Sequence, residues 1–240
     1  MATDFQPLHN ETHKDVKIGP AKSVEDLKDQ HALGLVVQEF AKASGEFPVV
    51  FLKDTASEKF FPVAMLGIEQ NVNLFVTADN KWDASYMPAR YTHKPLSVIP
   101  HKDDENKFAI AIDMASSLIS DDGFPLFDEE GKENEHLEKR KNALMAYIEH
   151  EKLTSSFIEK LVSLDLVQPR NLKVNVQEKE FNLNGLYLVD EKKLTELPDE
   201  QFLELRRLGY IAPIYAQLSS MNQLNKLLER QAKRMVAEAS

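Results

Sequence analysis

The hydrophobic pattern of this 240-residue chain changes character about halfway along its length. Between residues 47 and 112, short apolar runs such as FPVVFLKD and FFPVAMLGI are rich in valine and phenylalanine and are separated by turn-forming residues, which is typical of strands. Beyond about residue 133, apolar residues recur every three or four positions, as on one face of a helix. Because the expected strands have short connections, we expect antiparallel pairing. The sequence therefore predicts an α+β fold, with a mainly antiparallel sheet in the N-terminal half and a helix-rich C-terminal half.

Some element boundaries follow from local patterns. An apolar stripe predicts one helix over residues 133–152, and Ser156 followed by Glu159 resembles a capping box that would begin a second helix. Two further strands are expected at residues 172–176 and 185–189, with the bend between them near residues 182–184. The pair Asp79-Asn80 is expected at the tip of a hairpin.

The length of the chain fits one compact domain, because single domains commonly reach about 250 residues. We expect residues 1–14 to form a flexible N-terminal arm and residues 15–240 to form a single α+β domain. Within that domain, residues 15–125 are expected to be sheet-rich and residues 126–240 helix-rich.

The composition excludes several classes of protein. The chain has no cysteine, so disulfides, thiolate catalysis and iron–sulfur clusters are excluded. The first residues lack the basic start and apolar core of a conventional signal peptide. The longest apolar runs have the length of strands, well short of the roughly 20 residues of a transmembrane helix. We therefore expect a cytoplasmic protein with no transmembrane segment.

The acidic residues are unevenly distributed. The formal net charge is −10, and residues 103–138 contain twelve acidic residues against two lysines. This segment is expected to be a solvated loop and helix start, and the alternative is a contact for a basic partner. Because phosphate binding needs a basic face, nucleic acid is not expected as a partner.

One metal site can be formulated from the histidines. His101 and Asp103 form a His-x-Asp pair directly after an expected strand, and with a distant histidine, His136 or His150, they would make the facial ligand set of a non-haem Fe(II) oxygenase. The alternative is that His101 is a solvated loop residue. No nucleophile elbow, phosphate-binding glycine loop or dinucleotide fingerprint is present, so no catalytic residue is predicted.

Aromatic and polar residues are concentrated in one segment of the expected sheet. This segment contains the only tryptophan of the chain, and the candidate ligand-binding residues are Asn73, Trp82, Tyr86, Arg90 and Tyr91. They could form a groove with aromatic walls and one cation, for a small molecule or a peptide. The alternative is a packed sheet edge whose polar atoms are satisfied within the protein.

Two separated segments carry a family resemblance. The sequence NLFVTADNKWDASYMPARY, preceded by FPVVF and LGIEQN, and the stretch from Gly185 to Leu228 resemble the bacterial SapC-like family in pattern and order. The resemblance covers residues 18–228. The family takes its name from a protein linked to bacterial surface layers, so the resemblance implies a surface-layer, envelope or uptake role. It supplies no catalytic residue.

Three functions follow as expectations. The first is a non-enzymatic accessory protein that binds a small molecule, a peptide or a protein partner. The second is the Fe(II)-dependent oxygenase, and the third is a structural component of a surface layer. The leucine-rich final helix could serve the core or a homo-oligomer interface, so the oligomeric state stays open.

Overall fold

The computed structural model describes residues 3–20, 22–101 and 104–238, and for residues 101 and 104–107 it describes the backbone alone. Its contacts divide the chain into two compact units. Unit 1 comprises Met1–Val24 and Ala89–Glu149, and unit 2 comprises Glu25–Pro88 and His150–Ser240. The long helix α4, Glu135–Ser163, contributes residues to both units.

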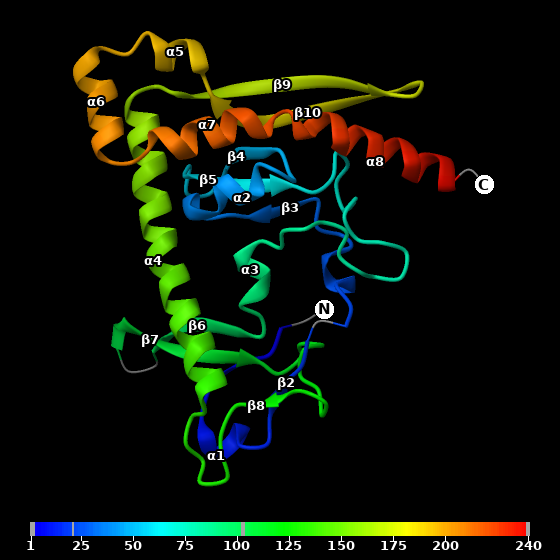
Figure 1. Cartoon of the computed structure of the whole chain (residues 1–240), viewed down its shortest axis with the longest axis vertical. Helices are drawn as coiled ribbons and strands as arrows, with labels where there is room; N and C mark the ends of the chain where they lie inside the picture. Colours follow the sequence, from blue (N-terminus) through cyan, green and yellow to red (C-terminus); the bar gives the residue numbers. More distant parts are fainter. Residues whose placement is uncertain (1–2, 21, 102–103, 239–240) are drawn as a thin grey trace. The chain divides into compact units, whose positions relative to one another are not determined.

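Unit 1 contains a small antiparallel sheet, and the first part of α4 packs against it (Figure 1). The three-stranded sheet has the order β1-β7-β6, and a separate pair joins β2 to β8. The other elements of unit 1 are β1 (Phe5–Pro7), α1 (Asn10–His13), β2 (Lys17–Ile18), α3 (Ala89–Thr92), β6 (Leu96–His101), β7 (Asp104–Asp113) and β8 (Phe124–Pro125).

The core of unit 1 follows from alternation along two paired strands. Leu96 lies opposite Ile112 and Val98 opposite Ile110, so every second residue of β6 and β7 faces the same side of the sheet. These side chains belong to one hydrophobic cluster that also contains Leu137 of α4. Unit 1 therefore has a core of its own.

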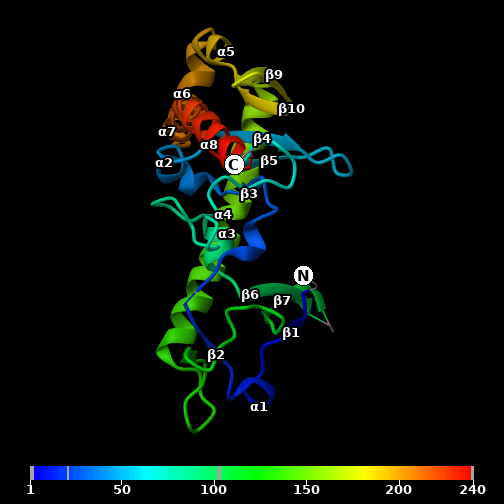
Figure 2. The ribbon, with the colours of Figure 1, turned by 90° about the vertical axis from the view of Figure 1, so that its right-hand side faces the viewer.

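Unit 2 contains a five-stranded antiparallel sheet in the order β3-β5-β4-β10-β9. Helices α2, α6 and α7 lie together on one side of these strands (Figure 2). The strands are β3 (Ala32–Gly34), β4 (Val49–Lys53), β5 (Phe60–Met65), β9 (Val167–Val176) and β10 (Lys179–Val189). The helices are η1 (Glu25–Leu27), η2 (Val37–Glu39), α2 (Phe40–Ala43), α5 (Glu191–Thr195), α6 (Asp199–Arg207), α7 (Ile211–Ser220) and α8 (Gln223–Glu238).

An aromatic contact fixes which face of this sheet meets the helices. The ring of Phe51, on β4, lies 6.4 Å from that of Phe40 on α2, and Phe40 packs edge-on against Phe157 of α4 at 5.9 Å. All three side chains are fully buried. Since side chains alternate along a strand, Val50 and Leu52 point to the opposite face.

A buried amide joins β4 to β10 where the two strands would otherwise separate. In the described chain these strands share one residue pair, Tyr187 with Phe51. Gln217 of α7 donates from Nε2 to the carbonyl of Val49 (3.0 Å) and accepts at Oε1 from the N–H of Val189 (3.1 Å). The side chain of Gln217 therefore takes the place of a ladder pair.

The α+β prediction is confirmed, with antiparallel sheets and long helices towards the C-terminus. The prediction of two helices around Ser156 is wrong, because α4 runs without a break from Glu135 to Ser163. The hydroxyls of Thr154 and Ser155 bond back to the carbonyls of His150 and Glu151, at 2.6 and 3.1 Å. Bonds of this kind, from a hydroxyl to the carbonyl one turn back, are made inside a helix and fit a helix that continues through residues 154–155.

The predicted bend near residues 182–184 is also wrong. The hairpin turn lies between Val176 and Lys179, with Gln177 at a φ of 56°. Asn184 and Gly185 instead form a bulge within β10, where the pairing with β9 shifts between Leu183 and Leu186. The Asn-Gly dipeptide thus marks extra residues in a strand.

Two other expectations concern residues 1–14 and the pair Asp79-Asn80. Within the segment expected as an arm, β1 pairs with β7. Asn80 has a φ of 58° in the turn between Thr77 and Lys81, but the flanking residues form a single bridge, Val76 with Trp82, in place of two strands.

The expectation of one domain over residues 15–240 stays a prediction. Of the helices described, none combines the length and the apolar composition that crossing a bilayer requires.

Candidate functional site

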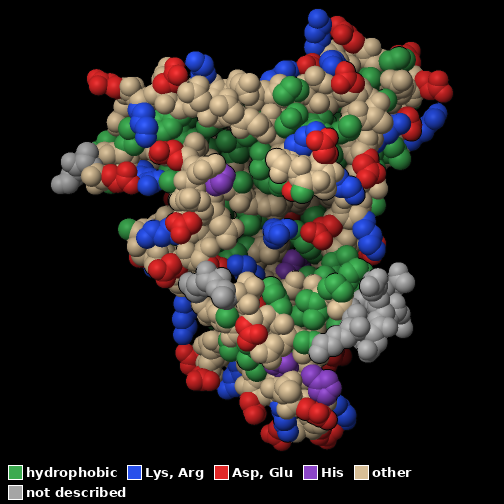
Figure 3. Space-filling view, turned by 180° about the vertical axis from the view of Figure 1, so that it is seen from behind, with side chains coloured by type: hydrophobic (Ala, Val, Ile, Leu, Met, Phe, Trp, Pro, Cys, Tyr) green, Lys and Arg blue, Asp and Glu red, His purple; other side chains and the backbone are tan. Residues whose placement is uncertain are grey.

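A pocket of about 300 Å³ lies in unit 2 on the face of the sheet that Phe51 does not occupy. We call it the sheet pocket. Figure 3 shows hydrophobic side chains recessed on this side of unit 2. Its apolar floor consists of Val50, Leu52, Val63, Met65, Leu183 and Leu186.

The strand register explains this floor. Val50 of β4 lies opposite Val63 of β5, and Met65 lies opposite Ala32 of β3. These residues alternate with the ones that face the helices, so one face of three neighbouring strands presents a continuous aliphatic surface. Val50, Val63 and Met65 are all buried.

A tight loop after β5 forms one wall of the pocket. The N–H groups of Leu66 and Gly67 donate to the carbonyl of His31 (2.7 and 3.0 Å), and the N–H of Leu74 donates to the carbonyl of Leu66 (2.7 Å). A Cβ atom on Gly67 would lie 1.8 Å from the carbonyl oxygen of Val72. Only glycine therefore permits this close approach of two backbone segments.

The bulge in β10 forms the opposite wall. Asn182 and Asn184 line the pocket beside the buried side chains of Leu183 and Leu186, and Asn184 belongs to the bulge itself. Gly185 has a φ of +75°, a conformation that glycine adopts without strain. Since a bulge redirects the side chains on either side of it, both leucines contribute to the floor.

Polar side chains occupy the rim of the sheet pocket. They are one imidazole, one carboxylate and three amides: His31, Glu69, Gln70, Asn182 and Asn184. Nδ1 of His31 accepts from the N–H of Asn71 at 3.4 Å, so the neutral tautomer with its proton on Nε2 fits this contact. An apolar floor with a few polar groups around it is typical of a site for a small molecule.

The carboxylate of Glu69 is engaged on both oxygens. Oε1 accepts from Nε2 of Gln231 (2.6 Å), and Oε2 lies 3.2 Å from Nζ of Lys179. Nζ of Lys179 also lies 4.6 Å from the centre of the Phe181 ring. These contacts tie the loop after β5 to helix α8 and to the start of β10.

The candidate residues Asn73, Trp82 and Tyr86 lie in unit 2, whereas Arg90 and Tyr91 lie in unit 1. Asn73 is buried, donates from Nδ2 to the carbonyl of Leu27 (3.0 Å) and accepts at Oδ1 from the N–H of Phe75 (2.9 Å). In unit 1, Arg90 and Tyr91 belong to the short helix α3, with Tyr91 buried and Arg90 exposed.

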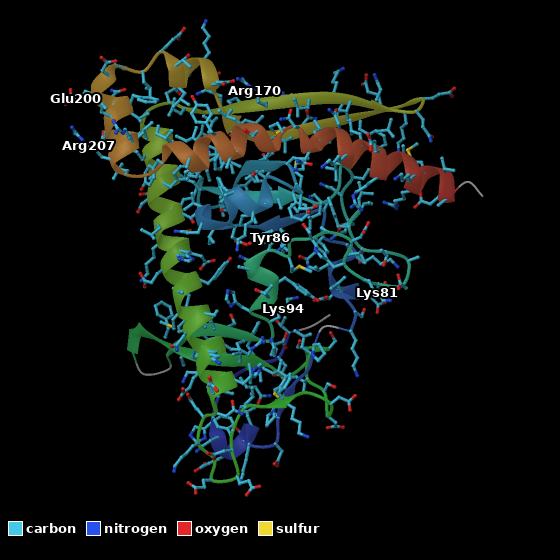
Figure 4. The ribbon with its side chains drawn as sticks, in the orientation of Figure 1. Lys81, Tyr86, Lys94, Arg170, Glu200 and Arg207 are labelled. Carbon is cyan, nitrogen blue, oxygen red and sulfur yellow. The ribbon has the colours of Figure 1, made fainter. Side chains whose placement is uncertain are left out.

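The rings around Trp82 pack within unit 2. The indole lies 6.0 Å from the ring of Phe47 and 5.8 Å from that of Phe75, and its Nε1 donates to the carbonyl of Tyr86 (2.9 Å). The hydroxyl of Tyr86, labelled in Figure 4, donates to Oε1 of the buried Glu39 (2.5 Å). None of these residues lines the sheet pocket as the structure describes it. Their role in ligand binding stays a prediction.

The metal candidates fall largely outside the described residues. Asp103 is not described, and of His101 only the backbone is described, at the end of β6. His136 lies in the first turn of α4 with its ring 5.2 Å from that of Phe124. Burial lowers the pKa of His136, and the positive charges of Arg140 and Lys139 lower it further. Within the described part of the chain, no group of three histidine or acidic side chains has the arrangement of a metal site.

A second cavity, of about 330 Å³, lies among η2, α2, α4 and α7 in unit 2. We call it the helix pocket. Ala41, Ala212, Pro213 and Ala216 line it, and Leu153 borders it with about half of its surface exposed. Its lining is mostly apolar, and Gln38 and Tyr210 are the polar side chains among the described lining residues, against five at the rim of the sheet pocket. It therefore offers fewer groups that could orient a ligand.

The sequence reasoning missed the sheet pocket, although two signals pointed to it. Gly67, Glu69 and Gln70 belong to the LGIEQN stretch that carries part of the family resemblance. The second signal was the Asn184-Gly185 pair, where the expected bend meets the expected strand, since a glycine in a strand can also mark a bulge.

The fold and the pocket define an α+β protein with a cavity of about 300 Å³ that combines an apolar floor with a polar rim. The family model for SapC matches residues 8–227. The chain therefore belongs to the SapC family. No curated protein and no solved structure matches it.

Proposed function

We propose that this chain is a non-enzymatic accessory protein of the SapC family that binds a small molecule in the sheet pocket. The observation that carries the proposal is the combination of an aliphatic floor with a rim of amide, imidazole and carboxylate groups. Such a pocket holds the apolar body of a ligand and orients it through a few hydrogen bonds.

The backbone around the pocket supports this proposal. Gly67 permits a backbone contact that no other residue allows, and Gly185 adopts a left-handed conformation within a strand. A regular strand and a regular turn would need neither feature. Bulges of this kind are frequent beside binding and catalytic sites.

The envelope connection is the second part of the proposal. It rests on the name of the family, which refers to bacterial surface layers, and we infer an accessory role in a surface-layer or uptake process. Fractionation of the bacterial cell tests this part. Recovery with the envelope, at least in part, is expected, and recovery only in the cytosol would contradict it.

A pair of matched variants tests the binding site. Ala32→Phe fills the sheet pocket from its edge strand, and Ala41→Phe fills the helix pocket instead. A fragment library screened by ligand-observed NMR is expected to give ligands that bind the unaltered chain and the Ala41→Phe variant. These ligands should lose binding to the Ala32→Phe variant.

The proposal fails if the bound fragments are insensitive to Ala32→Phe, or if Ala41→Phe alone abolishes their binding. Circular dichroism and a thermal unfolding curve of each variant establish that it is folded. If Ala32→Phe does not fold, Ala32→Leu fills part of the same space with a smaller side chain.

A further inference from the structure

The floor of the sheet pocket selects for an aliphatic group. Branched and straight aliphatic side chains form it, and no phenylalanine, tyrosine or tryptophan lines the pocket in the described part of the chain. An aromatic ligand would find no ring on this floor to stack against. An aliphatic group gains as much as any other apolar group from leaving water.

The rim selects for hydrogen-bonding groups that both donate and accept. Each of the amides of Gln70, Asn182 and Asn184 offers one carbonyl oxygen and two N–H donors. Gln70 and Asn184 are exposed at the mouth of the pocket. A ligand that carries an amide or a hydroxyl group can pair with side chains of this kind in either direction.

The charges at the rim compensate each other. Glu69, the acidic group that lines the pocket, pairs with Lys179 at 3.2 Å and accepts a second bond from Gln231. Lys179 itself does not line the pocket, so an anionic ligand would meet no lysine or arginine among the described lining residues, and a cationic ligand would meet a carboxylate that is already paired. An ionised head at the rim would give up part of its hydration without gaining a free ionic partner in return, which is costly.

The volume of the pocket limits the size of the ligand. At about 300 Å³, the pocket lies at the lower end of the range for small-molecule sites, roughly 300–1,000 Å³. A short aliphatic chain with one polar head fills such a space.

We infer that the ligand of the sheet pocket is a neutral molecule with a short aliphatic body and an amide or hydroxyl head. This inference rests on the proposed function, because it assigns the chemical class of the ligand to the same site. The aliphatic body lies on the floor between Val50 and Leu183, and the head bonds to the rim amides.

A series of probes with one common chain tests the inference. Hexanamide and 1-hexanol are neutral, hexanoate is anionic and hexylammonium is cationic at neutral pH, and benzamide replaces the chain by a ring. Ligand-observed NMR gives the dissociation constant of each probe. Hexanamide and 1-hexanol are expected to bind at least about tenfold more tightly than the other three.

Four variants locate the binding and its polar contacts. Ala32→Phe should weaken the binding of hexanamide at least about tenfold, and Ala41→Phe should leave this binding unchanged. Gln70→Ala should weaken the binding of hexanamide by about three- to tenfold, which corresponds to the loss of one hydrogen bond. Glu69→Gln leaves Lys179 without its carboxylate, so hexanoate should gain affinity relative to hexanamide in that variant.

The outcomes separate the inference from the proposed function. If hexanoate or hexylammonium binds as tightly as hexanamide and loses affinity in Ala32→Phe, the inference of a neutral ligand is wrong and the binding site stands. If benzamide binds most tightly of the five probes and loses affinity in Ala32→Phe, the inference of an aliphatic body is wrong and the binding site stands. If no probe depends on Ala32→Phe, both the inference and the proposed function are contradicted.

Discussion

Gly67 illustrates how a single residue shapes the candidate site. Its backbone passes so close to Val72 that a Cβ atom would lie 1.8 Å from the carbonyl oxygen. The atom in the way belongs to the backbone of a closed loop, so no side-chain rotation relieves the clash. The loop that carries Glu69 and Gln70 therefore depends on this glycine.

Replacement of Gly67 by alanine tests that dependence. Gly67→Ala is expected to lower the free energy of unfolding by about 1–3 kcal/mol, because the loop must move to admit the methyl group. Gly45→Ala is the matched control, since its Cβ would meet only the carbonyl of Lys42 at 3.6 Å. Urea unfolding monitored by circular dichroism measures both values. Equal stability of the two variants would contradict the loop geometry.

Gln217 provides a second test at this scale. It is fully buried and bonds two backbone groups, the carbonyl of Val49 and the N–H of Val189. Gln217→Leu should lower the free energy of unfolding by about 2–4 kcal/mol, because the N–H of Val189 loses its partner in the interior and the carbonyl of Val49 keeps only a 3.5 Å contact with the hydroxyl of Ser220. Gln38→Leu, at an exposed position, should change it by about 0.5 kcal/mol or less. A loss below 1 kcal/mol for Gln217→Leu, on the same urea curves, would contradict this role.

Two histidines of unit 1 predict a pH dependence. Burial lowers the pKa of His93, and the charge of Arg140 lowers it further; burial also lowers the pKa of His136. The unfolded chain binds protons to these rings near the ordinary value of about 6.5. It therefore takes up more protons than the folded chain as the pH falls through that value.

The contribution of His93 and His136 to the free energy of unfolding is fully present above the pKa that these rings have in the unfolded chain. It decreases as the pH falls below that value. Urea unfolding between about pH 7 and pH 5 should show decreasing stability for the unaltered chain. The free energy of unfolding of the double variant with His93→Gln and His136→Gln should decrease less over the same pH range. If the free energy of unfolding falls with pH in parallel for the two proteins, these rings do not titrate as inferred.

At the scale of elements, α4 shows why a local signal can mislead. Ser156 and Glu159 have the spacing of a capping box, yet the helix continues through them. The hydroxyl of Thr154 bonds to the carbonyl of His150 and accepts from the N–H of Val37 at 2.8 Å. A partner about 120 residues earlier in the chain thus holds this turn in a helix, and no local pattern reveals it.

Amide hydrogen exchange tests the continuity of α4. Residues 153–158 are expected to exchange slowly, as in the interior of a helix, because their N–H groups are bonded four residues back. Two helices separated near Ser156 would leave several of these amides open to solvent. Fast exchange confined to residues 153–156, beside slow exchange at residues 145–150, would contradict a single helix.

The elements also show what the sequence could predict. The change from strand-like runs to helical spacing correctly indicated the α+β class and antiparallel pairing. The hairpin turn at Gln177 was missed because no glycine or proline marks it, and the Asn184-Gly185 pair that looked like a turn is a bulge. Local residue types indicate an irregularity in the backbone, whereas the pairing with β9 decides which kind it is.

At the scale of the whole molecule, charge and candidate site lie in different units. The acidic segment of residues 103–138 belongs to unit 1, whereas the sheet pocket belongs to unit 2. Four distant segments, from β3, β4, β5 with its loop, and β10, build the pocket. The sequence suggested Asn73, Trp82, Tyr86, Arg90 and Tyr91 because aromatic and polar residues are concentrated in one segment. The sheet pocket depends on strand register, which the sequence does not display.

Methyl-resolved NMR of the full chain tests the central claim most directly, since it reports where a ligand binds. On addition of hexanamide, the signals of Val50, Val63 and Met65 in the sheet pocket should shift. Those of Ala212 and Ala216 in the helix pocket should remain in place. Shifts at the two alanines alone, or no shift at the three residues of the sheet pocket, would contradict the account.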